Sequence, residues 1–322
     1  MTASVDNKKD NKKELTPSME SFTWGGFTWL NIERPTQKEM DYLAQHYPFN
    51  TYDLEDCLSK RQQSKLDVYQ DYLFYIFQFS VWDKATKISK SDKVSVFVGK
   101  DYLITLHDGQ LKPLVNLFRE CQINEEVRQD SLRNGSGPLL YKILDGVIDY
   151  YFPILNSILS WVDELEDAVF DENIDTGQEV AALRRDIITQ RRILHSVRTA
   201  SLDLEKQIGR FSKVDLSVQF GDFMDHVNKA CDTLDEYKEI VEVFKDTDFV
   251  LSTDRLNRIM RIMTIIATVS LPFIVVPSIY GMNISMPGSV NSGSWLSFIV
   301  IMLFTLLVTG IMLYYFRRRR WI

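Results

Sequence analysis

Three consecutive residues near the C-terminus, Gly281, Met282 and Asn283, combine a flexible backbone with a neutral oxygen ligand. Glycine at a helix end permits positive φ and leaves backbone carbonyl oxygens uncovered. The amide oxygen of Asn283 can hydrogen-bond the water around a cation without immobilising the ion by a full charge. A ring of such oxygens at a pore mouth would filter a hydrated ion. An ordinary helix C-cap before a loop is the alternative, and a bare Gly-x-Asn triplet does not exclude it.

Residues at steps of three and four upstream of this motif share one helix face. They are Asn257, Met260, Thr264, Ala267, Leu271, Ile274 and Ser278. The stripe is mostly apolar, and its polar groups stand only near its ends. Mg²⁺ sheds its water reluctantly, so a path without carboxylates would pass the ion with its water still bound. An apolar path can also gate by dewetting. Ordinary helix packing would produce the same stripe.

The elements that must position these residues are two apolar segments, 262–280 and 295–316, which contain no Asp, Glu, Lys or Arg. Each segment is long enough to cross a bilayer as a helix. The linker 281–294 joins them into a hairpin. Arginines lie only on the outer flanks, at Arg255, Arg258 and Arg261 and again at 317–320. The positive-inside rule therefore places both termini in the cytoplasm of a multi-pass plasma-membrane protein.

The rest of the chain is more acidic than the net charge of −7 indicates, because seven of its positive charges flank the membrane segments. Acidity of this kind serves solubility, or it attracts divalent cations. It argues against nucleic acid as a partner. Three scattered cysteines fit a reducing compartment and no disulfide framework. The four histidines are equally scattered and no nucleophile elbow or phosphate loop is present, so neither an enzyme nor an organic cofactor is predicted.

Hydrophobic patterns divide the region before the membrane into strands and then long helices. Residues 72–82, 94–98 and 102–106 read as strands, with a hairpin turn at 99–101. Helical periodicity begins at Leu139 and continues, with breaks, into the first membrane segment. The predicted organisation is a disordered tail (1–21), a cytoplasmic α/β domain (22–135), a helical stalk (136–261), a pore-lining span (262–280), an extracellular loop with the Gly-Met-Asn motif (281–294), a second span (295–316) and a basic cytoplasmic tail (317–322).

The last helical pattern, from about 216 to 280, would be roughly 100 Å long at 1.5 Å per residue. One small domain cannot bury such a helix. Copies of the same chain are the simplest source of neighbouring helices that could pack against it. A single hairpin also cannot enclose an aqueous pore. Transport would therefore require an oligomer.

The sequence from about residue 22 to its end resembles the CorA family of divalent-cation channels. The resemblance is carried by Tyr280-Gly281-Met282-Asn283 after the first apolar segment, by the short loop, and by the terminal Arg-Arg-Arg-Arg-Trp-Ile. Asn257 and Thr264-Ile265-Ile266-Ala267-Thr268 also resemble the family's first span. The resemblance implies a funnel-shaped homopentamer with long stalk helices and a pore lined by the first span. It also implies passive flow of Mg²⁺, with Co²⁺ or Ni²⁺ as further ions, gated by cytoplasmic Mg²⁺.

The same resemblance assigns roles to individual residues. Gly281, Met282 and Asn283 would form the outer filter, and Asn257 would bind the hydrated ion near the cytoplasmic end. The remaining assignments are hydrophobic constrictions at Met260, Met263 and Leu271, a basic collar of Arg317, Arg318, Arg319 and Arg320, and regulatory inter-subunit metal ligands at Glu55, Asp56, Asp145 and Asp222. Exposed carboxylates of this kind can equally be ordinary surface charges.

Two positions depart from the family pattern. Gly288 stands where many members have a glutamate, which predicts less negative charge at the pore mouth and a lower external affinity. Ile274 stands where some relatives have threonine, so a polar ring in the middle of the pore is not expected.

Two other functions compete with a magnesium channel. One is zinc transport by the related branch of the superfamily, which usually departs from methionine at the centre of the motif; Met282 argues against it. The other is a membrane-anchored scaffold, which predicts that Asn283→Ala leaves ion flux unchanged.

Overall fold

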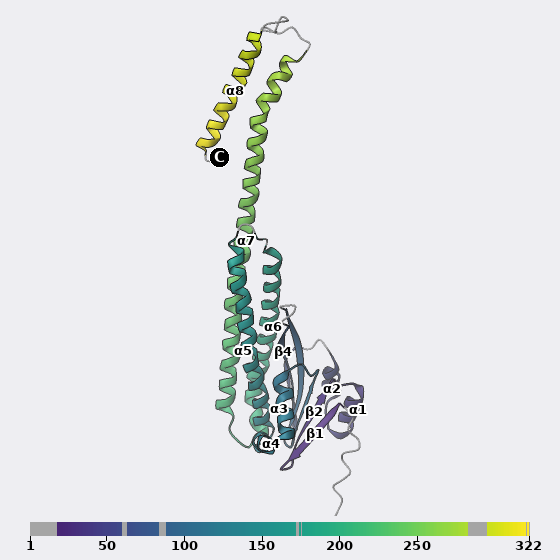
Figure 1. The fold of residues 1–322 in the computed structure, drawn as a ribbon. Helices are drawn as coiled ribbons and strands as arrows, with labels where there is room; N and C mark the ends of the chain where they lie inside the picture. Colours follow the sequence, from purple (N-terminus) through teal and green to yellow (C-terminus); the bar gives the residue numbers. More distant parts are fainter. Residues whose placement is uncertain are drawn as a thin grey trace, which may run out of the picture. The chain divides into compact units, whose positions relative to one another are not determined.

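The computed structural model describes residues 18–59, 63–83, 88–171, 174, 176–282, 295–319 and 321 (Figure 1). The chain forms two compact units. The first, here the α/β unit, comprises Met1–Val169 and Thr176–Lys245; the second, here the hairpin unit, comprises Phe170–Asp175 and Asp246–Ile322. Helix α7 (Ser217–Tyr280) begins in the first unit and ends in the second.

The described strands form one mixed sheet with the order β1-β2-β6-β5-β4-β3. Their bounds are β1 (Met19–Trp24), β2 (Phe27–Glu33), β3 (Lys65–Val68), β4 (Tyr72–Asp83), β5 (Ile88–Gly99) and β6 (Tyr102–His107). The pair β2–β6 is parallel and the other pairs are antiparallel. The predicted hairpin is present, with Val98 of β5 opposite Leu103 of β6.

Two strands extend beyond their predicted limits. Strand β5 begins six residues early, at Ile88, because its polar first half pairs with the end of β4. Strand β1 begins at Met19, so residues 19–21 belong to the sheet although the sequence assigned them to the tail. In both places the polar sequence offers few apolar side chains to bury. Backbone hydrogen bonds to the neighbouring strand stabilise the extended conformation there. Residues 1–17 of the predicted tail lie outside the described residues.

The two faces of the sheet are covered by different helices, because successive strand residues point to opposite sides. Tyr75, Phe77 and Phe79 pack in a core with the long helices. Phe74 and Ile76 pack on the other side, in the core that includes α1 (Gln37–His46) and α2 (Thr51–Leu58). Thr36 and Glu39 form a capping box at the start of α1, and Asn50 caps α2.

The other helices of the α/β unit are α3 (Lys112–Ile123), α4 (Glu125–Leu132), α5 (Ser136–Val169), α6 (Gly177–Ile208), a 3-10 turn, η2 (Gly209–Phe211), and the first part of α7. Helix α5 begins at Ser136, three residues before the predicted start; Ser136 is buried, and its hydroxyl donates to the carbonyl oxygen of Gly99 at 2.7 Å. A Cβ at Gly137 would lie 2.8 Å from Cδ1 of Leu216 and 2.9 Å from Cβ of Ser212, so a side chain there would force these neighbours to shift.

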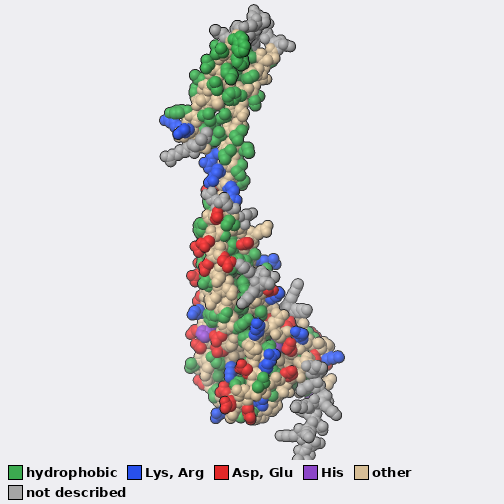
Figure 2. Space-filling model, in the orientation of Figure 1, with side chains coloured by type: hydrophobic (Ala, Val, Ile, Leu, Met, Phe, Trp, Pro, Cys, Tyr) green, Lys and Arg blue, Asp and Glu red, His purple; other side chains and the backbone are tan. Residues whose placement is uncertain are grey.

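The hairpin unit contains the end of α7 and α8 (Trp295–Arg318). Helix α7 and, within α8, the stretch Phe298–Arg318 are long and apolar enough to cross a membrane. Apolar side chains crowd the surface of the membrane-length part of this unit, and its basic side chains lie at one end of that part; acidic and basic side chains are spread over the α/β unit (Figure 2). Leu271, Val275 and Val276 of α7 face Phe304 and Val308 of α8 across an apolar hollow of about 210 Å³.

Candidate functional site

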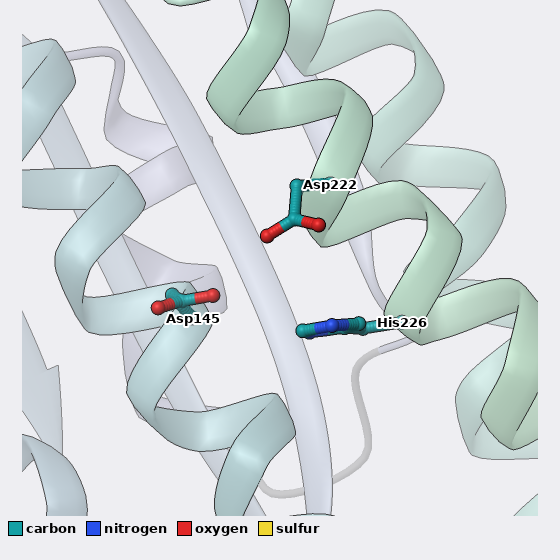
Figure 3. A group of neighbouring side chains, drawn as sticks. All are labelled: Asp145, Asp222 and His226. Atoms are coloured by element: carbon teal, nitrogen blue, oxygen red, sulfur yellow. The ribbon is translucent and has the colours of Figure 1, made fainter.

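Asp145, Asp222 and His226 form a cluster of potential metal ligands (Figure 3). One ligand atom from each of the three side chains lies within 4.8 Å of the others. Helix α5 supplies Asp145, and α7 supplies Asp222 and His226, which are four residues apart and so project from one helix face. In Figure 3 the three side chains point into the space between the two helices.

Packing of α7 against the core places the two α7 ligands. Phe223 and Val227 are fully buried, and each follows one of the ligands directly in the chain. Burial of these two side chains fixes the rotation of α7, so Asp222 and His226 come to the edge of the core beside α5. On α5 the fully buried residue, Leu144, comes directly before the ligand Asp145 and fixes that helix in the same manner.

Acidic charge dominates the cluster. Burial, and then the charge of Asp149, raises the pKa of Asp145, while His226 acts in the opposite direction. The Nδ1 atom of His226 lies 3.8 Å from an oxygen of Asp149 and has no hydrogen-bond partner among the described residues. A cation in this space would relieve the repulsion between carboxylates, which adds to burial in raising the pKa of Asp145.

The donors suit more than one class of divalent cation. Carboxylate oxygens suit Mg²⁺, which also keeps several of its water molecules. The imidazole nitrogen of His226 suits Co²⁺, Ni²⁺ or Zn²⁺. The cluster is therefore chemically fit to hold a divalent cation, and its histidine favours transition metals.

Two of the four predicted regulatory ligands come together here. Asp145 and Asp222 share the cluster, and both belong to one chain. His226 was missed, although its position four residues after Asp222 was a usable signal.

Glu55 and Asp56 belong to α2, which packs on the other face of the sheet. Glu55 is exposed, and a carboxylate oxygen of Asp56 lies 2.7 Å from Nζ of Lys65.

The predicted pore stripe is exposed along its whole length in the single chain. The exposed residues are Asn257, Met260, Met263, Thr264, Ala267, Leu271, Ile274 and Ser278. The hydroxyl of Thr264 donates to the carbonyl oxygen of Met260 at 2.7 Å, so the helix backbone uses that polar group. Leu271 also borders the hollow beside α8. Packing within one chain therefore leaves most of the stripe available to neighbours.

The end of α7 differs from the expectation for Gly281. Glycine at a helix end permits a turn with positive φ, but Gly281 does not have positive φ. Its N–H instead continues the helical pattern and donates to the carbonyl oxygen of Pro277 at 2.8 Å. A Cβ at Gly281 would lie 3.2 Å from that oxygen, which is a tight contact within the last helical turn. Met282 follows, with its N–H donating to Ile279.

The structure describes only some of the other predicted filter and collar residues. Asn283 and Gly288 are outside the described residues, and so is Arg320. Arg317, Arg318 and Arg319 are exposed at the end of α8.

The model of one protein family, described as CorA-like Mg²⁺ transporter protein, matches residues 24–318. The chain belongs to this family. CorA-like proteins are metal-ion transporters, and the two long apolar helices agree with a transmembrane protein.

Individual relatives support the same family. YfjQ of Bacillus subtilis is 26% identical over 301 residues, which cover 91% of this chain and 89% of the relative. The cobalt/magnesium transport protein CorA of Thermotoga maritima is 26% identical over 185 residues, covering 57% of this chain and 52% of the relative. The zinc transport protein ZntB of Yersinia enterocolitica is 23% identical and covers 60% of each chain.

The fold has solved counterparts. The complete structure of the CorA magnesium transporter from Methanocaldococcus jannaschii superposes with a TM-score of 0.75 at 22% identity and covers 92% of each chain. The CorA fold, with its α/β region, long helix and two apolar C-terminal helices, is therefore shared.

Proposed function

We propose that this CorA-like protein is a funnel-shaped homopentameric channel that carries Mg²⁺ passively across the plasma membrane, with Co²⁺ or Ni²⁺ as further ions. Both termini would be cytoplasmic. The observation that carries the proposal is the exposed, charge-free end of α7, which leads directly to Gly281-Met282-Asn283. The chain belongs to a family of metal-ion transporters, so we assign this exposed surface to metal-ion transport.

Oligomerisation follows from the exposed stripe. Met260, Leu271 and Ile274 are 60%, 54% and 66% exposed in one chain. A single hairpin cannot surround water, so the stripe acquires a pore-lining role only when several copies place it around one axis. Chemical cross-linking in detergent tests the number of copies, and five are expected.

Neutral chemistry explains how such a path would conduct. Asn283 would hold the hydrated ion through its amide oxygen, and Asn257 would do so at the cytoplasmic end. Met260, Met263 and Leu271 would form the apolar constrictions, with Arg317–320 as a basic collar. The membrane potential contributes about 2.3 kcal/mol per charge per 100 mV, hence roughly 4.6 kcal/mol for a divalent ion.

Regulation is proposed for the acidic cluster. Mg²⁺ between Asp145, Asp222 and His226 would neutralise repulsion between α5 and α7, and Glu55 and Asp56 would bring a neighbouring subunit's α2 into the same response. Loss of the ion would leave like charges that repel, which favours movement of the long helices and opening. This assignment is supported by the distances in the cluster and by the raised pKa of Asp145.

Zinc remains the second candidate ion. ZntB proteins are among the relatives, and the imidazole of His226 suits zinc. Met282 favours magnesium, since the zinc branch usually departs from methionine at that position.

The test of the proposed function is flux into proteoliposomes that contain the full chain. Mg²⁺, Co²⁺ and Zn²⁺ are supplied one at a time, and protein-free liposomes are the control. Mg²⁺ entry well above the control is expected, with slower Zn²⁺ entry. A protein that only tethers a scaffold would give no entry above the control for any ion.

The test of regulation is the same flux with Mg²⁺ preloaded inside. Internal Mg²⁺ should slow entry in the wild type and fail to do so in the Asp145→Asn/Asp222→Asn variant. Asp163→Asn on the exposed side of α5 is the matched control. Unchanged inhibition in the double variant would refute the sensor.

A further inference from the structure

Apolar surface lines the open hollow of about 210 Å³ between α7 and α8. Its lining on α8 includes Phe304, Val308 and Met312. Thr305 also borders it, but the threonine hydroxyl donates to the carbonyl oxygen of Ile301 at 2.8 Å, so the helix backbone uses that polar group. Such a space offers water no polar partners. An apolar group, such as a hydrocarbon chain, is therefore the chemistry that fits the hollow.

One face of α8 leads from the hollow to the arginines at its end. Four residues at steps of four, three and four share this face: Val308, Met312, Tyr315 and Arg319. Arg319 directly follows the last residue of α8, and its N–H still donates to the carbonyl oxygen of Tyr315 at 3.0 Å. The guanidinium of Arg319 lies 5.8 Å from the centre of the Tyr315 ring. Arg317 stands on the opposite side, because nine residues after Val308 make two and a half helical turns.

Helix α7 brings a second arginine to the same end of the hairpin. Arg261 precedes Pro272, a residue of the hollow, by about three helical turns, so both lie on one side of α7. Ile265 and Thr268 follow Arg261 on that side and are half-buried, whereas Ala267 is exposed. This side of α7 is therefore the one turned toward α8. Because the hairpin reverses the chain, Arg261 before the hollow and Arg319 after it belong to the same end.

Positive charge at this end has little negative charge to balance it. From Arg255 to the end of the chain the sequence contains seven arginines and no Asp or Glu. The arginines at 317–319 are exposed, and no carboxylate of the described residues forms an ion pair with them. Trp321 lies beside them, with its ring stacked on that of Phe316 at 5.7 Å. Arginine and tryptophan at the boundary of an apolar segment suit the level of lipid headgroups.

We propose that each hairpin binds one anionic phospholipid, with an acyl chain in the hollow and the phosphate at Arg261 and Arg319. The rise from Val308 to Arg319 is about 16 Å at 1.5 Å per residue. This rise is close to half of the roughly 30 Å hydrocarbon core, so one lipid spans from the arginines to the hollow. A zwitterionic lipid fills the hollow equally well but does not balance the arginines, so charge selects the anionic class. The site goes beyond the proposed channel and requires only that the hairpin crosses a membrane.

The test of the headgroup is titration of the purified full chain in detergent with dioleoylphosphatidylglycerol, followed by native mass spectrometry. Dioleoylphosphatidylcholine, which has the same acyl chains and no net charge, is the control lipid, and the wild type should bind it more weakly. Arg319→Gln should weaken phosphatidylglycerol binding roughly fivefold, the effect of one basic residue near a lipid surface. Arg317→Gln removes the same charge from the opposite side of the helix and should leave binding within about twofold.

The test of the acyl chain uses the same titration. Val308→Phe places a ring in the hollow and should weaken the binding of both lipids. Val300→Phe is the matched control, because Val300 is exposed on α8 and does not line the hollow. Inorganic phosphate, added as a competitor, should not displace phosphatidylglycerol, since it has no chain to place in the hollow.

Equal losses in Arg319→Gln and Arg317→Gln would overturn the proposal, because they would show general attraction of charge. Equal binding of the two lipids by the wild type, or displacement by inorganic phosphate, would overturn it too. If Val308→Phe keeps its lipid but changes the number of cross-linked copies, the hollow holds a second copy instead. Arg319 lies outside the apolar segments, so Arg319→Gln decides the proposal even where Val308→Phe does not fold. Ion flux is a separate readout: lipid binding without flux rejects only the channel.

Discussion

The α/β unit and the hairpin unit handle charge in opposite ways. In the α/β unit, carboxylates are drawn into the structure and given partners: Asp53 accepts from two tyrosine hydroxyls, and Asp56 contacts Lys65. In the hairpin unit, 262–282 and 295–316 contain no charged side chain at all. Charge collects where an ion would be sensed, and it is absent where an ion would pass. The contrast matches the two tasks proposed for this chain, which are to sense a divalent cation and to let it pass.

Burial differs between the units in the same sense. Phe223 in the first part of α7 is fully buried, whereas Phe298 of α8 is 59% exposed. The α/β unit excludes water by packing its own side chains. The hairpin unit presents apolar side chains outward, as a surface that faces lipid or other copies requires.

The largest predicted effect compares the same substitution, phenylalanine to alanine, in the two units. Phe223→Ala should lower the free energy of unfolding by about 3–5 kcal/mol, because it leaves a cavity in a filled core. Phe298→Ala should cost under about 1 kcal/mol, since lipid or detergent replaces the lost contacts. Denaturant unfolding in detergent, followed by tryptophan fluorescence, measures both. Equal losses would mean that the two units are packed alike.

A smaller effect concerns pH and the polar interior of the α/β unit. Burial lowers the pKa of His107 to about 4; its Nε2 lies 2.9 Å from the Asn31 side-chain oxygen. Because the folded pKa is below the ordinary value, the stabilisation is complete above about pH 6.5 and is lost as pH falls toward 4, by up to about 3 kcal/mol.

Unfolding measured from pH 7 to pH 4.5 tests this contribution. His107→Gln should lose less stability than the wild type over that interval, whereas His195→Gln on α6 should follow the wild type. Identical slopes for wild type and His107→Gln would show that His107 does not carry the effect.

The smallest predicted effect concerns metal binding at the cluster of Asp145, Asp222 and His226. His226→Ala should weaken Co²⁺ binding by roughly tenfold, or about 1.4 kcal/mol, and leave Mg²⁺ binding within about twofold, because Mg²⁺ prefers oxygen ligands and Co²⁺ accepts imidazole. Calorimetry with each ion separately gives both values. Equal losses for the two ions would indicate that His226 shapes the site without binding the metal.

Local pattern was sufficient to predict the features that depend on neighbouring residues in the chain. The apolar hairpin, the strands around 72–106 and the long helices all follow from periodicity and turn residues. Asp145 and Asp222 were assigned as inter-subunit metal ligands from resemblance to a family, not from periodicity, and the structure brings the two residues together within one chain.

Features that depend on distant partners were missed for physical reasons. The polar start of β5 becomes a strand only because β4 lies beside it. His226 becomes a candidate metal ligand only because α5 places Asp145 beside it. The contact between Asp56 and Lys65 depends on how α2 packs against β3. Gly281 was expected to permit positive φ, but it does not have positive φ; it lies just past the end of α7, and its N–H donates to the carbonyl oxygen of Pro277.

The central claim is that a neutral asparagine, not a charged group, admits the ion, and Mg²⁺ flux into proteoliposomes tests it most directly. Asn283→Ala should abolish most of the Mg²⁺ entry seen with the wild type, while Asn291→Ala, the other asparagine of the same linker, should keep it. Equal Mg²⁺ entry through wild type and Asn283→Ala would contradict the account.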